Sequence, residues 1–259
     1  NYEISSIAGT SMGSLIGGAY ATGRLNELKE WICALDKGKV FRLVDFTLSK
    51  QGLIKADRVL NKMKDYVPDV PIEDLPLPYA AVAVDMIKKE EVVFREGSLY
   101  HAIRASIAIP SVLTPLKIGN QLLVDGGVLN NIPIEHVQRS QRDIIIAVNV
   151  NADLSLPKPK VLDAEGEKRH RIYQGKIREF YSHLWKSSPG SKDEDLGYFS
   201  LLTRTLDLMT MHMAELTLRH HPPDILINVS RESCNMYDFY KAEEMIKLGR
   251  EAAVFALQS

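Results

Sequence analysis

The chain has 259 residues, of which 45% are hydrophobic and 25% are charged, and its formal net charge is −1. These values are typical of an ordinary globular protein and exclude the strongly basic surface of a nucleic-acid-binding protein. No apolar run approaches the roughly 18 residues of a membrane span. The two cysteines, Cys33 and Cys234, suggest neither a disulfide framework nor a metal site, so we expect both to be reduced.

Strands and helices are predicted to alternate along the chain. In chain order we expect a strand at 2–8, helices at 14–22, 26–35 and 56–66, strands at 79–84 and 91–94, a helix at 99–108, strands at 121–124 and 143–150, a helix at 199–218, a strand at 224–229 and a helix at 239–256. Asn26 and Ser98 are the expected N-caps of two helices. This alternation is typical of an α/β layer fold with a mostly parallel sheet, which we expect to form a single domain over residues 1–259.

Two further segments carry expectations of their own. The run at 143–150 is apolar on both faces, which indicates a sheet covered on both sides. Residues 153–200 are polar and partly basic, and we expect them to form a mobile or loosely helical excursion.

The first predicted strand runs directly into a G-x-S-x-G pattern, Gly9-Thr10-Ser11-Met12-Gly13, followed by a predicted helix. A sharp strand-to-helix turn holds the serine out from the sheet, and the flanking glycines leave room for the crowded backbone. The serine then stands at the positive end of the helix, where the Met12 N–H can stabilise an oxyanion. The pattern predicts a nucleophile for acyl transfer, whereas a phosphate-binding loop would need a lysine that is absent.

A serine nucleophile needs a base, and histidine is the familiar one. None of the seven histidines lies at an expected strand end, although His101 and His136 lie on or beside predicted helices. Asp125 instead follows an apolar strand directly, before Gly126 and Gly127, which allow a sharp turn. An apolar setting raises the pKa of a carboxylate towards neutrality, which lets it act as a base. The residues leave open both this role and a simple Asp-Gly turn.

Two stretches of the chain, AGTSMGSLIGGAYATG and RASIAIPSVLTPLKIGNQLLVDGGVLNNIPIE, resemble the patatin-like phospholipases of the bacterial type. A G-x-S-x-G elbow and a D-G-G turn are the two hallmarks of that family, and both stand in the family's order. The similarity covers most of residues 4–151 and 201–253. It implies a three-layer α/β/α sandwich with a mostly parallel central sheet, and a Ser–Asp dyad that works without histidine.

Carried over residue by residue, the resemblance implies that Ser11 is the nucleophile and Asp125 the base. The residues that would shape the two turns are Gly9, Gly13, Gly126 and Gly127. The implied activity is hydrolysis of fatty-acyl esters in phospholipids and related lipids, of phospholipase A or lysophospholipase type, through an acyl-serine intermediate. No metal or cofactor is expected. The family's first strand and Gly-rich oxyanion loop match nothing in this chain, so we expect them upstream of Asn1.

The expected partner is a phospholipid or another fatty-acyl ester, and no nucleic acid. The basic residues of the polar excursion are expected either to contact an anionic membrane surface or to cover the site as a lid, and they are Lys158, Lys160, Lys168, Arg169, Arg171, Lys176 and Arg178. We expect a bacterial protein of the cytoplasm or of the membrane periphery. The sequence carries no signal for an oligomeric state.

Two other functions remain open. The chain could be an esterase with a Ser-His-Asp triad that uses His136 or His101. It could also be a lipid- or protein-binding module that keeps the fold without catalysis, although such a module would need neither Ser11 nor Asp125. These two residues therefore favour a hydrolase.

Overall fold

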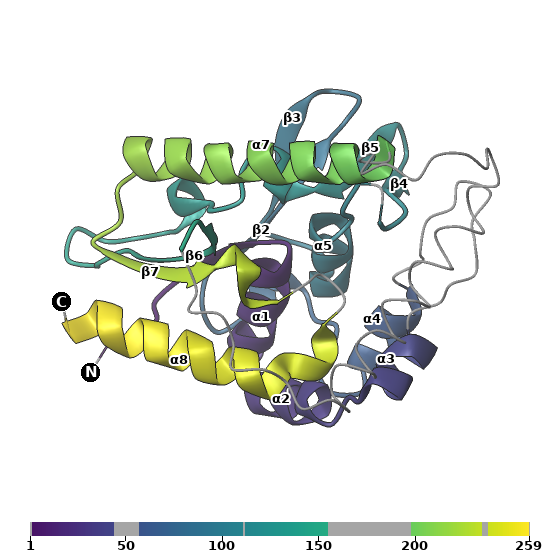
Figure 1. Cartoon of the computed structure of the whole chain (residues 1–259), viewed down its shortest axis with the longest axis horizontal. Coiled ribbons are helices and arrows are strands. Elements are labelled where there is room, and N and C mark those ends of the chain that lie inside the picture. Colours follow the sequence, from purple (N-terminus) through teal and green to yellow (C-terminus); the bar gives the residue numbers. More distant parts are fainter. Residues whose placement is uncertain (1, 44–56, 111, 155–197, 235–237, 259) are drawn as a thin grey trace, which may run out of the picture.

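A mixed sheet and a separate pair of strands organise the computed structural model, which describes residues 2–43, 57–110, 112–154, 198–234 and 238–258 (Figure 1). In this part of the chain the strands are β1 (Ile7–Thr10), β2 (Tyr79–Asp85), β3 (Glu90–Phe94), β4 (Leu116–Ile118), β5 (Gln121–Asp125), β6 (Ile146–Ala152) and β7 (Ile225–Ser230). The helices are α1 (Met12–Ala21), α2 (Leu25–Cys33), α3 (Lys37–Leu43), α4 (Asp57–Met63), α5 (Leu99–Ser106), α7 (Tyr198–His220) and α8 (Ala242–Gln258).

Strand β2 lies at the centre of the main sheet, and all seven of its residues are buried. Ala81 and Val82 pair with both β1 and β3, whereas Ala83 to Asp85 pair with both β3 and β5. Since a strand has only two edges, β1 and β5 must follow one another along the same edge of β2. β1 runs parallel to β2 and β5 runs antiparallel to it, so the carboxyl ends of β1 and β5 meet.

The expected α/β fold is confirmed, but the main sheet is mixed rather than mostly parallel. The β1–β2 and β6–β7 pairs are parallel, while the β2–β3, β2–β5 and β4–β5 pairs are antiparallel. The connections at 86–89 and 119–120 are too short for the crossover that parallel neighbours require, so the strands that they join are hairpins. Sequence periodicity identifies a strand but does not determine its direction.

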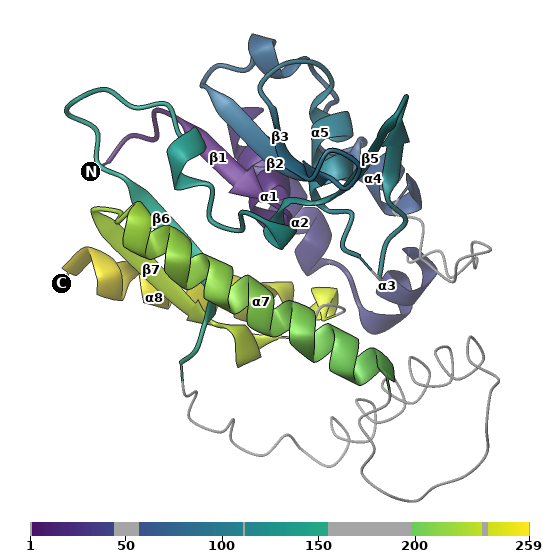
Figure 2. The same cartoon turned by 90° about the horizontal axis from the view of Figure 1, so that it is seen from above.

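Helices lie on both sides of the strands, as a three-layer fold requires (Figures 1 and 2). α1 and α5 pack on the main sheet, and their apolar residues share one core with Tyr79 and Ala81 of β2. In Figure 1 the β6–β7 pair lies between α7 and α8, with α7 in contact with β6 and α8 in contact with β7. α1 and α5 thereby bury one face each, whereas no residue of α8 is fully buried.

Two local expectations have opposite outcomes. Ser98 is confirmed as the N-cap of α5, where its Oγ accepts a hydrogen bond from the His101 N–H at 3.1 Å. The expectation for Asn26 is wrong, because α2 begins one residue earlier, at Leu25, with Arg24 at the N-cap position and without a side-chain cap.

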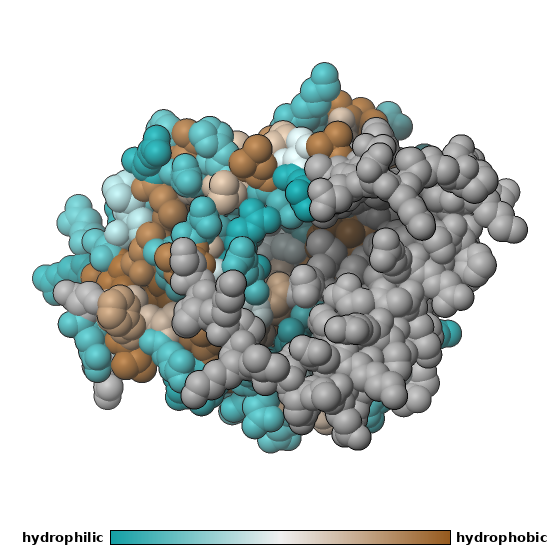
Figure 3. Space-filling view, in the orientation of Figure 1, coloured by the Kyte–Doolittle hydropathy of each residue, from teal (hydrophilic) through white to brown (hydrophobic). Residues whose placement is uncertain are grey.

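Within the described part of the chain, strand β6 is covered on one face only, so the expectation of cover on both faces is wrong for this strand as described. Ala147 is buried in a small core with Ala214 of α7. The alternate side chains of Ile146, Val148 and Val150 are exposed. Figure 3 shows hydrophobic side chains gathered on the left of the view, over the region of β6, β7 and α8. Successive side chains of a strand point to opposite faces, so an unbroken apolar run does not reveal which face is buried.

The expected polar excursion at 153–200 falls almost entirely on residues 155–197, outside the described part of the chain, as do the basic residues expected to touch a membrane. The expectation of one domain over residues 1–259 stays a prediction for the same reason. Of the helices that the structure describes, none combines the length and the apolar character needed to cross a membrane.

Candidate active site

The turn between β1 and α1 holds Ser11 in a strained backbone conformation, with φ 54° and ψ −122°. A side chain with Cβ rarely adopts a positive φ, and such strain persists only where the surroundings enforce it. The enforcing group is Ser106, the fully buried last residue of α5. Its Oγ accepts the Ser11 N–H at 2.9 Å and donates to the Val82 carbonyl at 2.6 Å. The last turn of α5 thereby fixes the predicted elbow to the centre of the sheet.

The N-terminus of α1 begins directly at this elbow. The N–H groups of Ser14 and Leu15 donate to the Ser11 carbonyl at 3.0 and 3.3 Å. The N–H groups of Met12 and Gly13 precede them and have no acceptor within the helix, because the first turn has none to offer. The first turn also contains no acidic residue that would neutralise the helix dipole. The Ser11 side chain therefore stands beside a region of positive potential.

Close backbone approach explains two of the four motif glycines. A Cβ at Gly9 would overlap the carbonyl group of Gly13 and come within 2.6 Å of the Ser14 nitrogen. A Cβ at Gly126 would overlap the Val82 carbonyl. These are the two points where the ends of β1 and β5 press against their neighbours. Among the described residues, a Cβ on Gly13 would meet nothing within 4 Å.

This difference predicts opposite effects for two matched substitutions. We expect Gly9→Ala to lower the free energy of unfolding by about 2–3 kcal/mol, because the added methyl group overlaps main-chain atoms that cannot rotate away. Gly13→Ala should leave it unchanged or raise it by up to about 1 kcal/mol, since alanine is the better helix former. Urea unfolding followed by circular dichroism measures both values. Equal stabilities of the two variants would contradict the close approach at Gly9.

Asp125 is the last residue of β5, and only 5% of its surface is exposed. Its N–H donates to the Ala108 carbonyl at 3.0 Å, and its Oδ1 accepts the Gly127 N–H at 2.7 Å. Burial raises the pKa of Asp125 to about 6, against the lowering effects of the Ser11 hydroxyl and the Gly127 N–H. A carboxylate with this pKa is ionised at neutral pH and can still take up a proton.

The Ser11 hydroxyl and the Asp125 carboxyl are thus brought together from positions far apart in the sequence. The Ser11 hydroxyl lies beside the carboxyl group and acts to lower its pKa. Asp125 Oδ2, however, is buried and has no hydrogen-bond partner among the described residues. The two groups are therefore neighbours, and no hydrogen bond joins them in this structure.

The two histidines of the alternative triad have other contacts. His136 Nε2 lies 2.8 Å from Glu91 Oε2. The His101 ring packs against Phe94, with 6.5 Å between the ring centroids. Neither of these recorded contacts involves Ser11 or Asp125.

The sequence does not predict two further residues that position this site. Ser106 lies in the RAS segment of the family resemblance, but nothing in its spacing indicates a bond to Ser11. Asn130 lies in the turn after Asp125 and is 2% exposed. Its N–H donates to the Gly126 carbonyl and its carbonyl accepts the Thr10 hydroxyl, both at 2.8 Å. Asn130 therefore ties the turn after β5 to the last residue of β1.

Comparison with known proteins points in one direction. A family model described as patatin-like phospholipase matches residues 1–137. NTE family proteins of Mycobacterium bovis and Mycobacterium tuberculosis, both named as uncharacterized, are 32% identical over 306 aligned residues that cover 100% of this chain and 84% of each relative. The mouse patatin-like phospholipase domain-containing protein 6 is 30% identical over 154 residues, 56% of this chain and 11% of that protein.

Proposed function

Because this chain belongs to the patatin-like phospholipase family, we propose that it hydrolyses fatty-acyl esters of lipids with Ser11 as nucleophile and Asp125 as base. Membership of this family supports a hydrolase that acts on lipids. The dyad rests on the geometry of this chain. The observation that supports the dyad is that the ends of β1 and β5 meet along one edge of β2. The Ser11 hydroxyl, directly after β1, thereby lies beside the buried Asp125 carboxyl at the end of β5.

In the proposed acylation step, Ser11 Oγ attacks the ester carbonyl carbon and its proton passes to the Asp125 carboxylate. The negative charge that develops on the carbonyl oxygen is stabilised at the N-terminus of α1, with the Met12 N–H as the proposed donor. The carbon–oxygen bond to the alcohol then breaks, and the leaving alcohol takes the proton from Asp125. These events leave an acyl-serine and an ionised carboxylate.

In the proposed deacylation step, Asp125 takes a proton from a water molecule that attacks the acyl-serine carbonyl. The fatty acid leaves as the bond to Ser11 Oγ breaks, and Ser11 recovers its proton from Asp125. One carboxylate thus serves as base and acid in both halves of the reaction. The burial of Asp125 supports this double role, because its raised pKa places it near the working pH.

The raised pKa predicts the pH dependence of the reaction. The base must be ionised to accept the Ser11 proton, and the pKa of Asp125 is about 6. We therefore expect kcat/KM to fall about tenfold per pH unit below pH 6 and to reach a plateau above about pH 7. Initial rates with a soluble p-nitrophenyl ester, measured from pH 4.5 to 8.5 at constant ionic strength, give this profile.

A histidine base would titrate in the same range, so the profile needs a control. The variant His101→Gln should keep both the plateau rate, within a few-fold, and the apparent pKa, and His136→Gln should keep the apparent pKa because Asp125 is still the titrating group. Loss of several orders of magnitude in either variant would instead support the Ser-His-Asp triad.

The finer features of the substrate remain part of the proposal. A phospholipid or another fatty-acyl ester is the substrate that fits the family. Rates of fatty-acid release from diacyl and monoacyl phospholipids distinguish phospholipase A activity from lysophospholipase activity. We also propose contact with a membrane surface, where such substrates reside. The bacterial relatives support a bacterial origin.

A further inference from the structure

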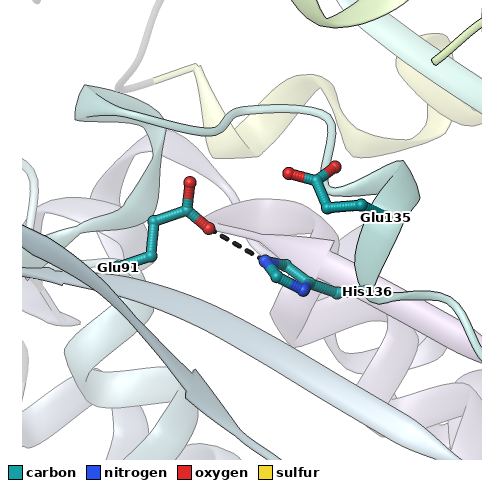
Figure 4. Close-up of side chains that lie close together, drawn as sticks. All are labelled: Glu91, Glu135 and His136. Carbon is teal, nitrogen blue, oxygen red and sulfur yellow. Dashed lines mark hydrogen bonds and ion pairs between the residues drawn. The ribbon is translucent and has the colours of Figure 1, made fainter. Parts of the chain in front are cut away.

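A cluster of metal-ligand side chains lies beside the turn that follows Asp125. It consists of Glu91 from β3, and of Glu135 and His136 from the short 3₁₀ turn Ile134–His136. One ligand atom from each residue lies within 4.8 Å of the other two. Figure 4 shows the Glu91 carboxylate facing the His136 ring, with the Glu135 carboxylate turned towards the same space. Sequence spacing could not reveal this cluster, because Glu91 comes from a distant strand.

A second observation concerns the buried side chain of Asn130, which faces the cluster. The side-chain amide of this buried residue is directed into it, where Nδ2 donates to Glu135 Oε1 at 2.7 Å and to Glu91 Oε2 at 3.3 Å. Its Oδ1 is buried and has no hydrogen-bond partner among the described residues. An unpaired buried amide oxygen lowers the stability of the fold by about 1–3 kcal/mol. The two orientations of an Asn amide differ only in which atom, oxygen or nitrogen, faces each hydrogen-bond partner.

Reversing the Asn130 amide would turn the unpaired Oδ1 towards two carboxylates. That arrangement is repulsive unless a cation lies between the oxygens, in which case Oδ1 becomes a further ligand. In the present orientation the amide N–H groups instead hydrogen-bond to Glu135 and Glu91, the carboxylates that would bind a cation. The arrangement of Asn130 is therefore compatible with two states, one without an ion and one with it.

The donor set indicates the class of ion. One imidazole nitrogen, two carboxylates and an amide oxygen combine the ligands that suit Zn²⁺ and its first-row neighbours, whereas Ca²⁺ and Mg²⁺ prefer oxygen alone. The His136 ring is half-buried between the sheet and the turn, with a side-chain exposure of 20%. The main-chain carbonyl of His136 accepts a hydrogen bond from Arg95 at 3.0 Å. This bond holds the turn in place and does not involve the ring nitrogens.

We propose that Glu91, Glu135, His136 and Asn130 bind a divalent transition-metal ion, with Zn²⁺ as the best fit. The ion would join β3 to the segment that runs from Asp125 to His136. Through the backbone of Asn130, this segment already contacts Gly126 and the Thr10 hydroxyl. The ion thus has a structural role in holding the turn after β5, and the proposal does not depend on ester hydrolysis.

Metal binding by the whole, tag-free chain tests this proposal directly. The protein is stripped with EDTA, dialysed, and titrated with ZnCl₂ by isothermal calorimetry, with the bound ion counted by mass spectrometry of the metal. We expect one Zn²⁺ per chain at this site and affinity at least about tenfold lower in Glu135→Gln and in His136→Gln. Ca²⁺ should bind more weakly than Zn²⁺.

Glu135→Gln is the sharper variant, because it leaves the Glu91–His136 pair and an oxygen that can still accept from Asn130. Its folding without metal is checked by circular dichroism. Glu215→Gln and His220→Gln, on α7 and outside the cluster, are the matched controls and should bind Zn²⁺ as the unaltered chain does. Equal binding by Glu135→Gln and the unaltered chain, no Zn²⁺ bound by the folded chain, or tighter binding of Ca²⁺ would each overturn the proposal.

Discussion

Replacing Ser11 with alanine is expected to lower kcat/KM for ester hydrolysis by about 10⁴- to 10⁶-fold, the range found when a nucleophilic serine is removed from a hydrolase. The effect is large because the hydroxyl oxygen forms the covalent bond of the acyl-enzyme, and no other group of the elbow replaces it. Release of p-nitrophenol measures the rate. Mass spectrometry of the full chain after treatment with a fluorophosphonate measures the covalent step independently.

The backbone strain at Ser11 calls for a second variant. Glycine adopts φ 54° without penalty, so Ser11→Gly removes the hydroxyl while it relieves strain. Both variants should be folded, inactive and unlabelled, whereas the exposed-serine variant Ser140→Ala should keep full activity and one label. Label on a folded Ser11→Ala chain, or hydrolysis at the rate of the unaltered chain, would exclude Ser11 as the nucleophile. An unlabelled and inactive unaltered chain would favour the binding-module alternative.

Asp125→Asn is expected to reduce kcat/KM by about 10³- to 10⁴-fold, which is the contribution of a well-placed general base. Asparagine has nearly the same shape, and its amide oxygen can still accept the Gly127 N–H. The variant should therefore fold normally and lose only the capacity to take up a proton. It should also lose the fall in rate below pH 6, because the titrating group is gone.

A surface carboxylate provides the comparison for this variant. Asp153→Asn changes an exposed side chain and should leave the rate and the pH profile unchanged. A rate for Asp125→Asn within a few-fold of the unaltered chain would remove Asp125 from the mechanism. It would leave the metal proposal untouched, since Zn²⁺ binding is measured without any substrate.

The sequence was sufficient for the order and type of most elements and for the local chemistry of the elbow. The strand–turn–helix at Ser11 follows from an apolar run, a glycine on each side of the serine and small residues after it. The cap at Ser98 was also readable, because an N-cap is a local interaction between a side chain and a nearby N–H. The error at Asn26 is local too, since the N-cap position falls on Arg24, two residues earlier in the chain.

Strand direction and exposure could not be read in the same way. Which elements pack nearby determines the antiparallel pairing of β5 with β2 and the exposure of one face of β6. The apolar content of a strand does not predict these neighbours. The spacing of residues in the sequence likewise does not predict the cluster of Glu91 with His136, because one comes from a strand and the other from a distant turn.

What the sequence by itself determined is therefore the strand–turn–helix elbow at Ser11, the carboxylate at a strand end and the family to which both belong. Only the tertiary structure decided that these two strand ends meet. β1 and β5 occupy the same edge of β2 in opposite directions, with Thr10 opposite Val82 and Asp125 opposite Ala83. The physical reason is that backbone hydrogen bonding to a shared neighbour sets the register of each strand, and register, not sequence distance, places one side chain beside another.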